Sequence, residues 1–74
     1  MDTAKVLEII THYAQLDSPP STKTTLEDLD MDSIHLLEMT QSFKDQFNVH
    51  LQHDDILLSS SVADILAVLK KRGA

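Results

Sequence analysis

The residues with the clearest chemical potential lie in the segment DLDMDSIHLLEM, residues 28–39, where Asp32 and Ser33 directly precede an apolar run. Such a serine can be a nucleophile, but only with a general base nearby. His35 is the closest histidine in sequence, and two residues along a helix correspond to roughly 200°, so its side chain should point away from the hydroxyl. Glycines of the kind that form a nucleophile elbow do not flank the serine. The sequence therefore argues against catalysis by Ser33.

Two other interpretations of Ser33 remain open. The serine can simply start a helix, with Asp32 or its own hydroxyl as the N-cap. It can also be a substrate for another enzyme, because the free backbone N–H groups and the dipole at a helix N-terminus tolerate a phosphate attached there. We expect the hydroxyl to be exposed in both cases.

A second polar group could bind a divalent metal ion. It comprises His50, His53, Asp54 and Asp55, whose side chains are common metal ligands. These residues lie where a loop should meet a short helix, and a solvated polar turn is the better explanation for them. We therefore predict no metal site.

Length and charge limit the possible functions. The chain has 74 residues, a formal net charge of -6 and a pI near 4.8, which predicts one small acidic domain over residues 1–74. A chain this short buries only about 60–65% of its unfolded surface, so a deep catalytic site is not expected. The acidic balance disfavours nucleic acid and anionic lipid as partners and favours a basic protein surface.

The location follows from what the sequence lacks. It contains no cysteine, so neither a disulfide framework nor a thiolate metal site is expected. The start MDTAKVLEII has no basic region followed by a long apolar one, and no apolar run reaches the ~20 residues that span a bilayer. We predict a cytoplasmic monomer that does not bind membranes.

Apolar periodicity predicts the elements that position Ser33. The expected helices cover residues 3–16, 33–47 and 54–58, with a last one after a Ser61 cap. Residues 17–32 contain both prolines and should form a long loop, held to the core by Leu26, Leu29 and Met31. No segment alternates as a strand would. The predicted fold is all-α: a small four-helix bundle with a long loop between helices one and two and a short third helix.

At about 100° per residue, the helix over 33–47 has two distinct faces. The predicted core face carries Leu36, Met39, Thr40, Phe43 and Phe47. The opposite face carries Ile34, Leu37, Glu38, Gln41 and Asp45. Two branched aliphatic residues thus lie among polar ones where water is expected. They are either ordinary surface residues or loop contacts, or they form a docking surface for a partner protein.

Together these features resemble the acyl carrier protein family, which includes the peptidyl carriers of modular synthetases. The stretch DLDMDSI is similar to the family signature Asp-Leu-Gly-x-Asp-Ser-Leu, with Asp30 in the place of the usual glycine. Glu38, Phe47 and the SSSV before the last helix fall where the family has Glu, Phe and a Ser/Thr-Thr-Val start. The resemblance covers nearly the whole chain.

The resemblance implies a four-helix bundle whose Ser33 receives 4'-phosphopantetheine from coenzyme A through a phosphopantetheinyl transferase. The thiol of this arm would hold acyl or aminoacyl intermediates as thioesters for loading ligases, synthases or transferases, and the chain itself would not be an enzyme. Asp32 resembles the acid that assists the metal-bound phosphate chemistry of the transferase. Ile34, Leu37 and Glu38 match the face that partner enzymes contact.

Two residues bear on the pathway. His35 and Lys44 occupy positions that are commonly acidic in fatty-acid carriers. We therefore predict a carrier of a specialised pathway, such as polyketide or nonribosomal peptide biosynthesis. The alternatives are a housekeeping carrier of fatty-acid synthesis and an unmodified helical interaction module that docks through Ile34 and Leu37.

Overall fold

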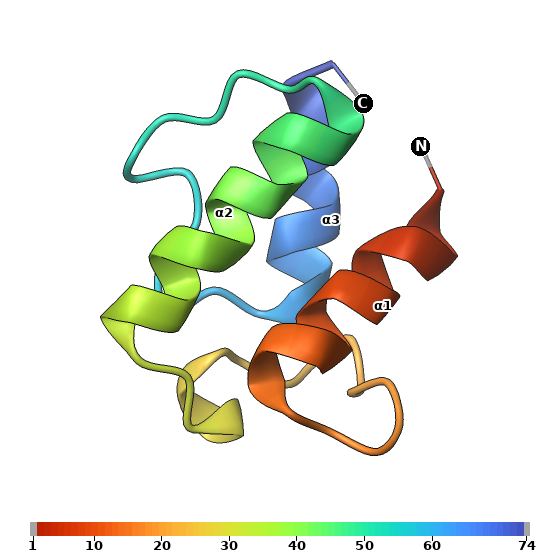
Figure 1. The fold of residues 1–74 in the computed structure, drawn as a ribbon, viewed down its shortest axis with the longest axis vertical. Helices are drawn as coiled ribbons and strands as arrows, with labels where there is room; N and C mark the ends of the chain where they lie inside the picture. The colour runs from red at the N-terminus through yellow and green to blue at the C-terminus, as the bar shows by residue number, and fades with distance from the viewer. Residues whose placement is uncertain (1, 74) are drawn as a thin grey trace.

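The computed structural model describes residues 2–73. They form three α-helices and one short 3-10 helix, in the order α1 (Thr3–Ala14), η1 (Glu27–Leu29), α2 (Ser33–Phe47) and α3 (Val62–Lys71) (Figure 1). Within these residues the β structure is confined to one isolated antiparallel bridge between Thr25 and Ser61. The prediction of an all-α fold is confirmed. None of the described helices combines the length and the apolar character that crossing a membrane requires.

Each α-helix begins at a polar residue whose side chain accepts a backbone hydrogen bond. Asp2 caps α1, Asp32 caps α2, and Ser61 caps α3 in a reciprocal capping box with Asp64. At the other end of α1, Gln15 adopts the left-handed conformation with φ 57°, which ends the helix at Ala14 rather than at residue 16 as predicted.

The predicted short helix over 54–58 is wrong, because this segment consists of turns and bends. Its geometry is set by Asp55, whose carboxylate accepts the Gln52 backbone N–H at 2.9 Å. The same carboxylate receives the Arg72 guanidinium at 2.8 and 2.9 Å, which ties the segment to the end of α3. A four-helix bundle is therefore not observed among the described residues.

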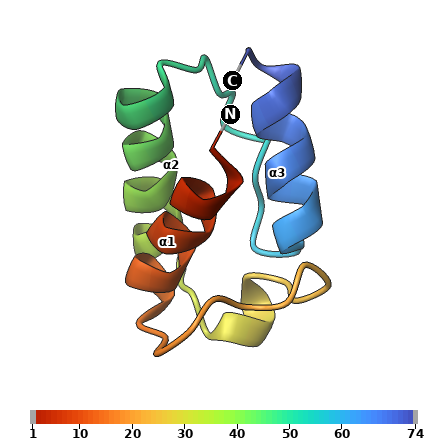
Figure 2. The same cartoon turned by 90° about the vertical axis from the view of Figure 1, so that its right-hand side faces the viewer.

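The long loop after α1 is ordered by the three predicted contacts. Leu26 is fully buried, Met31 is buried, and Leu29 packs against the core. The loop backbone also bonds to the segment before α3: the Leu26 N–H donates to the Ser60 carbonyl at 3.1 Å. Figures 1 and 2 show the loop and η1 lying across one end of the three helices.

The core confirms the predicted orientation of α2. Met39 and Phe43 are fully buried, and Leu36, Thr40 and Phe47 are half-buried. The buried apolar residues of the other elements are Val6, Ile9, Ile10, Leu26, Met31, Val49, Leu51, Ile56, Val62, Ile65 and Leu69. Because α2 presents one face to this core, its other face and its N-terminal end are left to solvent.

Candidate functional site

Ser33 is the first residue of α2 and is exposed. The cap of the helix is the preceding Asp32, whose Oδ1 accepts the His35 backbone N–H at 2.8 Å. Among residues 2–73, the Ser33 hydroxyl makes no hydrogen bond. Of the two possible caps, Asp32 is therefore the one observed. The Ser33 hydroxyl is not used for capping and remains accessible.

The surroundings of this hydroxyl suit an attached phosphate. Within the described chain, the backbone N–H groups of Ser33 and Ile34 have no hydrogen-bond partner, as expected for the first turn of a helix. Such N–H groups and the positive end of the helix dipole favour negative charge. The residues present therefore fit a phosphodiester on the Ser33 oxygen.

His35 contacts the cap rather than the serine. Its Nδ1 lies 3.1 Å from Asp32 Oδ1, and both side chains are substantially exposed. No hydrogen bond joins the imidazole to the Ser33 hydroxyl in the described part of the chain. The pairing of nucleophile and base that serine catalysis requires is not formed here.

A small cavity opens beside Ser33, with a volume of about 220 Å³. It lies between α2 and the segment over residues 51–56, and its lining residues are Ser33, Leu36, Leu37, Thr40, Lys44, Leu51, Gln52, His53 and Ile56. Sequence reasoning missed the contribution of Leu51 and Ile56, because the segment that carries them was predicted to be partly helical. Their apolar character was the only available signal.

The partner-face residues predicted from the helical wheel are all exposed. Ile34 is 67% exposed and Leu37 is 70% exposed, whereas aliphatic side chains that form a core are buried. Glu38, Gln41 and Asp45 are exposed on the same side of α2. Leu57, 48% exposed, is a further exposed aliphatic that the sequence analysis did not single out.

The polar group at residues 50–55 does not converge on a common point. Among residues 2–73, no three His, Cys, Asp or Glu side chains are close enough to hold a metal ion. Asp55 is engaged instead with Arg72 and with the Gln52 N–H, and these hydrogen bonds lower the pKa of its carboxyl group below the ordinary value. This carboxylate stabilises the turn.

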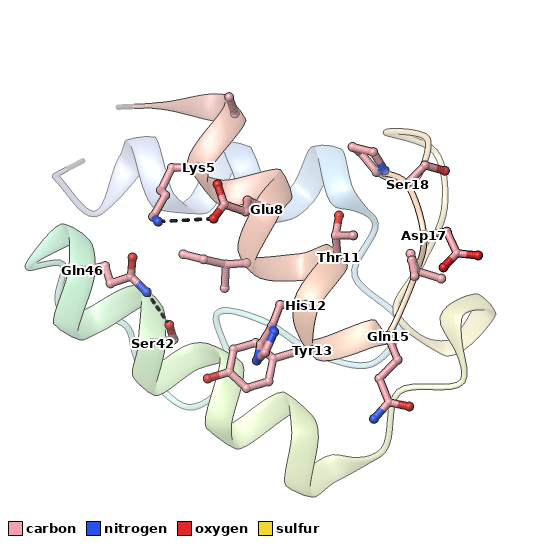
Figure 3. A pocket seen from close by; sticks show the side chains of 14 residues that line it. Lys5, Glu8, Thr11, His12, Tyr13, Gln15, Asp17, Ser18, Ser42 and Gln46 are labelled. Carbon is pink, nitrogen blue, oxygen red and sulfur yellow. Dashed lines mark hydrogen bonds and ion pairs between the residues drawn. The ribbon is translucent and has the colours of Figure 1, made fainter.

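A groove larger than the cavity beside Ser33 lies elsewhere. It has a volume of about 700 Å³ and is formed by α1, the start of the following loop and α2 (Figure 3). Two side-chain pairs lie along its walls, each within one helix: Lys5 with Glu8 at 3.5 Å on α1, and Gln46 with Ser42 at 2.9 Å on α2. Neither Asp32 nor Ser33 lines it, so size alone does not identify the functional site.

This small all-α domain thus has a free, exposed serine at the start of its longest helix, directly after a capping aspartate. The chain matches the family model described as "Phosphopantetheine attachment site" over residues 4–69, and it belongs to this family. Neither the search of curated proteins nor the search of solved structures gives a match. The resemblance to acyl and peptidyl carriers is confirmed, and 4'-phosphopantetheine is the prosthetic group of the domain.

Proposed function

We propose that Ser33 carries the 4'-phosphopantetheine arm and that the domain delivers acyl or aminoacyl thioesters to partner enzymes without catalysing a reaction itself. The observation that carries this assignment is the free and exposed Ser33 hydroxyl at the start of α2. The other serines differ in their surroundings. The side chains of Ser21, Ser42, Ser60 and Ser61 accept structural hydrogen bonds. Ser18 and Ser59 lie outside the helices.

Attachment requires the Ser33 oxygen to attack the coenzyme A phosphate next to the pantetheine. The Oγ–P bond forms, the pyrophosphate P–O bond breaks with adenosine 3',5'-bisphosphate as the leaving group, and the hydroxyl proton passes to the transferase. Asp32 is suited to assist, because within the described residues its Oδ2 makes no hydrogen bond while Oδ1 caps the helix. This free oxygen can approach the metal ion that a transferase holds on the phosphates.

The arm supplies a terminal thiol to a chain that contains no cysteine. The cavity beside Ser33 opens at the point where the arm would be attached, and Leu36, Leu51 and Ile56 contribute apolar side chains to it. A short apolar cargo could be partly sheltered there from water. The cavity supports the choice of an apolar acyl or aminoacyl cargo.

The partner enzymes would include a phosphopantetheinyl transferase and the ligases, synthases or transferases that load and use the arm. We propose that they contact Ile34, Leu37, Glu38, Gln41 and Asp45, which are exposed along the helix that Ser33 begins. A partner must rest near the root of the arm for its tip to reach an active site. His35 and Lys44 reduce the acidic character of this helix and favour a specialised pathway, such as polyketide or nonribosomal peptide synthesis.

The assignment is tested by incubating the protein with coenzyme A and a broad-specificity transferase and recording an intact-mass spectrum. The wild type should gain one phosphopantetheine group and one titratable thiol, and Ser33→Ala should gain neither. An unmodified wild type would favour the second candidate, a helical interaction module. The exposure of Ile34 and Leu37 is the observation that supports this alternative.

A further inference from the structure

The cavity beside Ser33 follows one side of α2. Ser33 lines it at the start of the helix, and Lys44 lines it 11 residues later. Leu36 and Thr40 line it between these two positions. Because successive members of this series are three or four residues apart, they share one face of the helix. At about 1.5 Å per residue, Lys44 lies about 16 Å along the helix axis from Ser33.

The arm proposed on Ser33 is long enough to reach Lys44. It has about fourteen bonds between the serine oxygen and its sulfur, and it spans about 16 Å at the length per bond of an extended polypeptide. Side chains on a helix point back toward its N-terminus, so the ammonium group of Lys44 is directed toward the preceding turn. An arm that follows the cavity would therefore bring its thiol and cargo close to this ammonium group, with its phosphate at the opposite end.

The charge of the cavity differs from that of the whole chain. The chain has 12 acidic residues against 6 Lys and Arg, yet neither Asp nor Glu is among the residues that line the cavity. Within residues 2–73, Lys44 takes part in no ion pair. Leu51 and Ile56 are buried and give the cavity an apolar wall. An unpaired cation beside an apolar wall suits a ligand that has both a hydrocarbon part and a negative charge.

We propose that Lys44 binds a carboxylate at the free end of the acyl group that the arm carries. The methylene groups of this cargo would lie against Leu51 and Ile56, and its carboxylate would accept a hydrogen bond from the Lys44 ammonium group. An aminoacyl cargo is disfavoured, because its own ammonium group would approach that of Lys44. The proposal rests on the proposed function and narrows the cargo to short acyl groups that end in a carboxylate, with Lys44 as the residue that determines this specificity.

The test uses the arm's thiol, which would be the sole thiol of a chain without cysteine. The 15N-labelled protein is modified with coenzyme A and transferase, and the thiol is then alkylated with either iodoacetate or iodoacetamide. In both reactions the sulfur displaces iodide and the thiol proton is lost to solvent. The arm then ends in a carboxymethyl or a carbamidomethyl group, and these two groups have nearly the same shape but differ in charge.

The amide signals of Thr40, Lys44 and His53 report on this end of the cavity. Relative to the free-thiol arm, the carboxymethyl arm should shift them about twofold to fivefold more than the carbamidomethyl arm does, the factor expected from one exposed ion pair. Equal shifts from the two arms would overturn the proposal. Shifts that depend on the carboxylate but occur only outside the cavity would overturn it as well.

Matched lysine variants test the role of the ammonium group. Lys44→Gln should abolish the difference between the two arms, and Lys44→Arg should retain it. Lys23→Gln makes the same change at an exposed lysine outside the cavity and should also retain the difference. A difference that persists in Lys44→Gln would contradict the proposal. So would an equal effect of Lys44→Gln on the 31P signal of the arm before and after alkylation, because Lys44 would then bind the arm's phosphate.

The failure of this proposal can be distinguished from the failure of the proposed function. A protein that gains the arm on Ser33 but responds equally to both alkylated ends would still be a carrier, and only the specificity assigned to Lys44 would be wrong. A protein that gains no arm, or gains it on another serine, would contradict the assignment of Ser33 and the proposal together.

Discussion

Asp32 Oδ1 receives the His35 backbone N–H at 2.8 Å and lies 3.1 Å from the Nδ1 of the same residue. One carboxylate oxygen thus caps α2, whereas Oδ2 has no hydrogen bond within the described chain. The two oxygens of this side chain can therefore serve two separate purposes, helix capping and assistance to the modification of Ser33. The two roles can be separated by substitution.

Asp32→Asn should preserve the cap and impair modification. Asparagine caps helices about as well as aspartate, so the thermal midpoint should change little. The loss of the charged oxygen should slow transfer of the arm about tenfold or more, as for other residues that support a metal-bound reaction. Asp32→Ala should lose both functions and cost about 0.5–2 kcal/mol of stability. The rate is measured by mass spectrometry with limiting transferase, and a wild-type rate for Asp32→Asn would exclude Asp32 from the reaction.

Phe43 should be the most sensitive position of α2. It is fully buried, so Phe43→Ala should cost about 3–5 kcal/mol and unfold much of so small a domain. Phe47 stacks on Phe43 with centroids 6.1 Å apart but is only half-buried, and its truncation should cost less. Urea unfolding followed by circular dichroism gives both values. A larger loss for Phe47→Ala than for Phe43→Ala would contradict the observed packing.

The aliphatic residues of the partner face should matter more than its charges. Burying an aliphatic side chain contributes roughly 1.5–3 kcal/mol, and an exposed charge pair contributes about 0–1 kcal/mol. Leu37→Ala or Ile34→Ala should therefore reduce the kcat/KM of a cognate partner enzyme more than Glu38→Gln does, with the fold retained. Added salt should mainly slow association. Lys23→Ala in the loop is the control, and damage by that variant alone would move recognition to residues 17–31.

The pair of Asp55 and Arg72 should make stability depend on acid pH. Hydrogen bonds from Arg72 and from the Gln52 N–H lower the pKa of Asp55 in the folded state, so the ionised carboxylate stabilises the fold. This contribution is complete above the unfolded pKa of about 4 and is lost as the pH falls through the lower folded value. The urea midpoint of the wild type should therefore fall more steeply below about pH 4 than that of Asp55→Asn. Asp17→Asn should follow the wild type, and parallel curves for Asp55→Asn and the wild type would contradict the role of the pair.

The sequence predicted the features that depend on local pattern. The orientation of α2, the exposure of Ser33 and the burial of Leu26 and Met31 follow from apolar spacing and helix-start residues, which act within a few positions of the chain. The predicted helix at 54–58 failed because Asp55 is fixed by Arg72, 17 residues away. Such a tertiary contact leaves no periodic signal.

The grooves could not be predicted from the sequence either, because each forms between segments that are distant in the chain. The groove of Figure 3 needs the packing of α1 beside α2, and the cavity at Ser33 needs the fold of residues 51–56. Asp30, in contrast, departs from the family signature for a reason that the local backbone explains. Its φ of 58° lies in the left-handed region, which explains why the family usually has glycine there and why aspartate, which tolerates that region better than most residues, can replace it.

The position of the arm tests the central claim most directly. After incubation with coenzyme A and transferase, trypsin should release residues 24–44 between Lys23 and Lys44, a peptide that contains Ser33 and Ser42. Fragmentation of this peptide by tandem mass spectrometry distinguishes the two serines. We predict that all of the added phosphopantetheine lies on Ser33. Phosphopantetheine on Ser42, or on a serine of any other peptide, would contradict the assignment of Ser33.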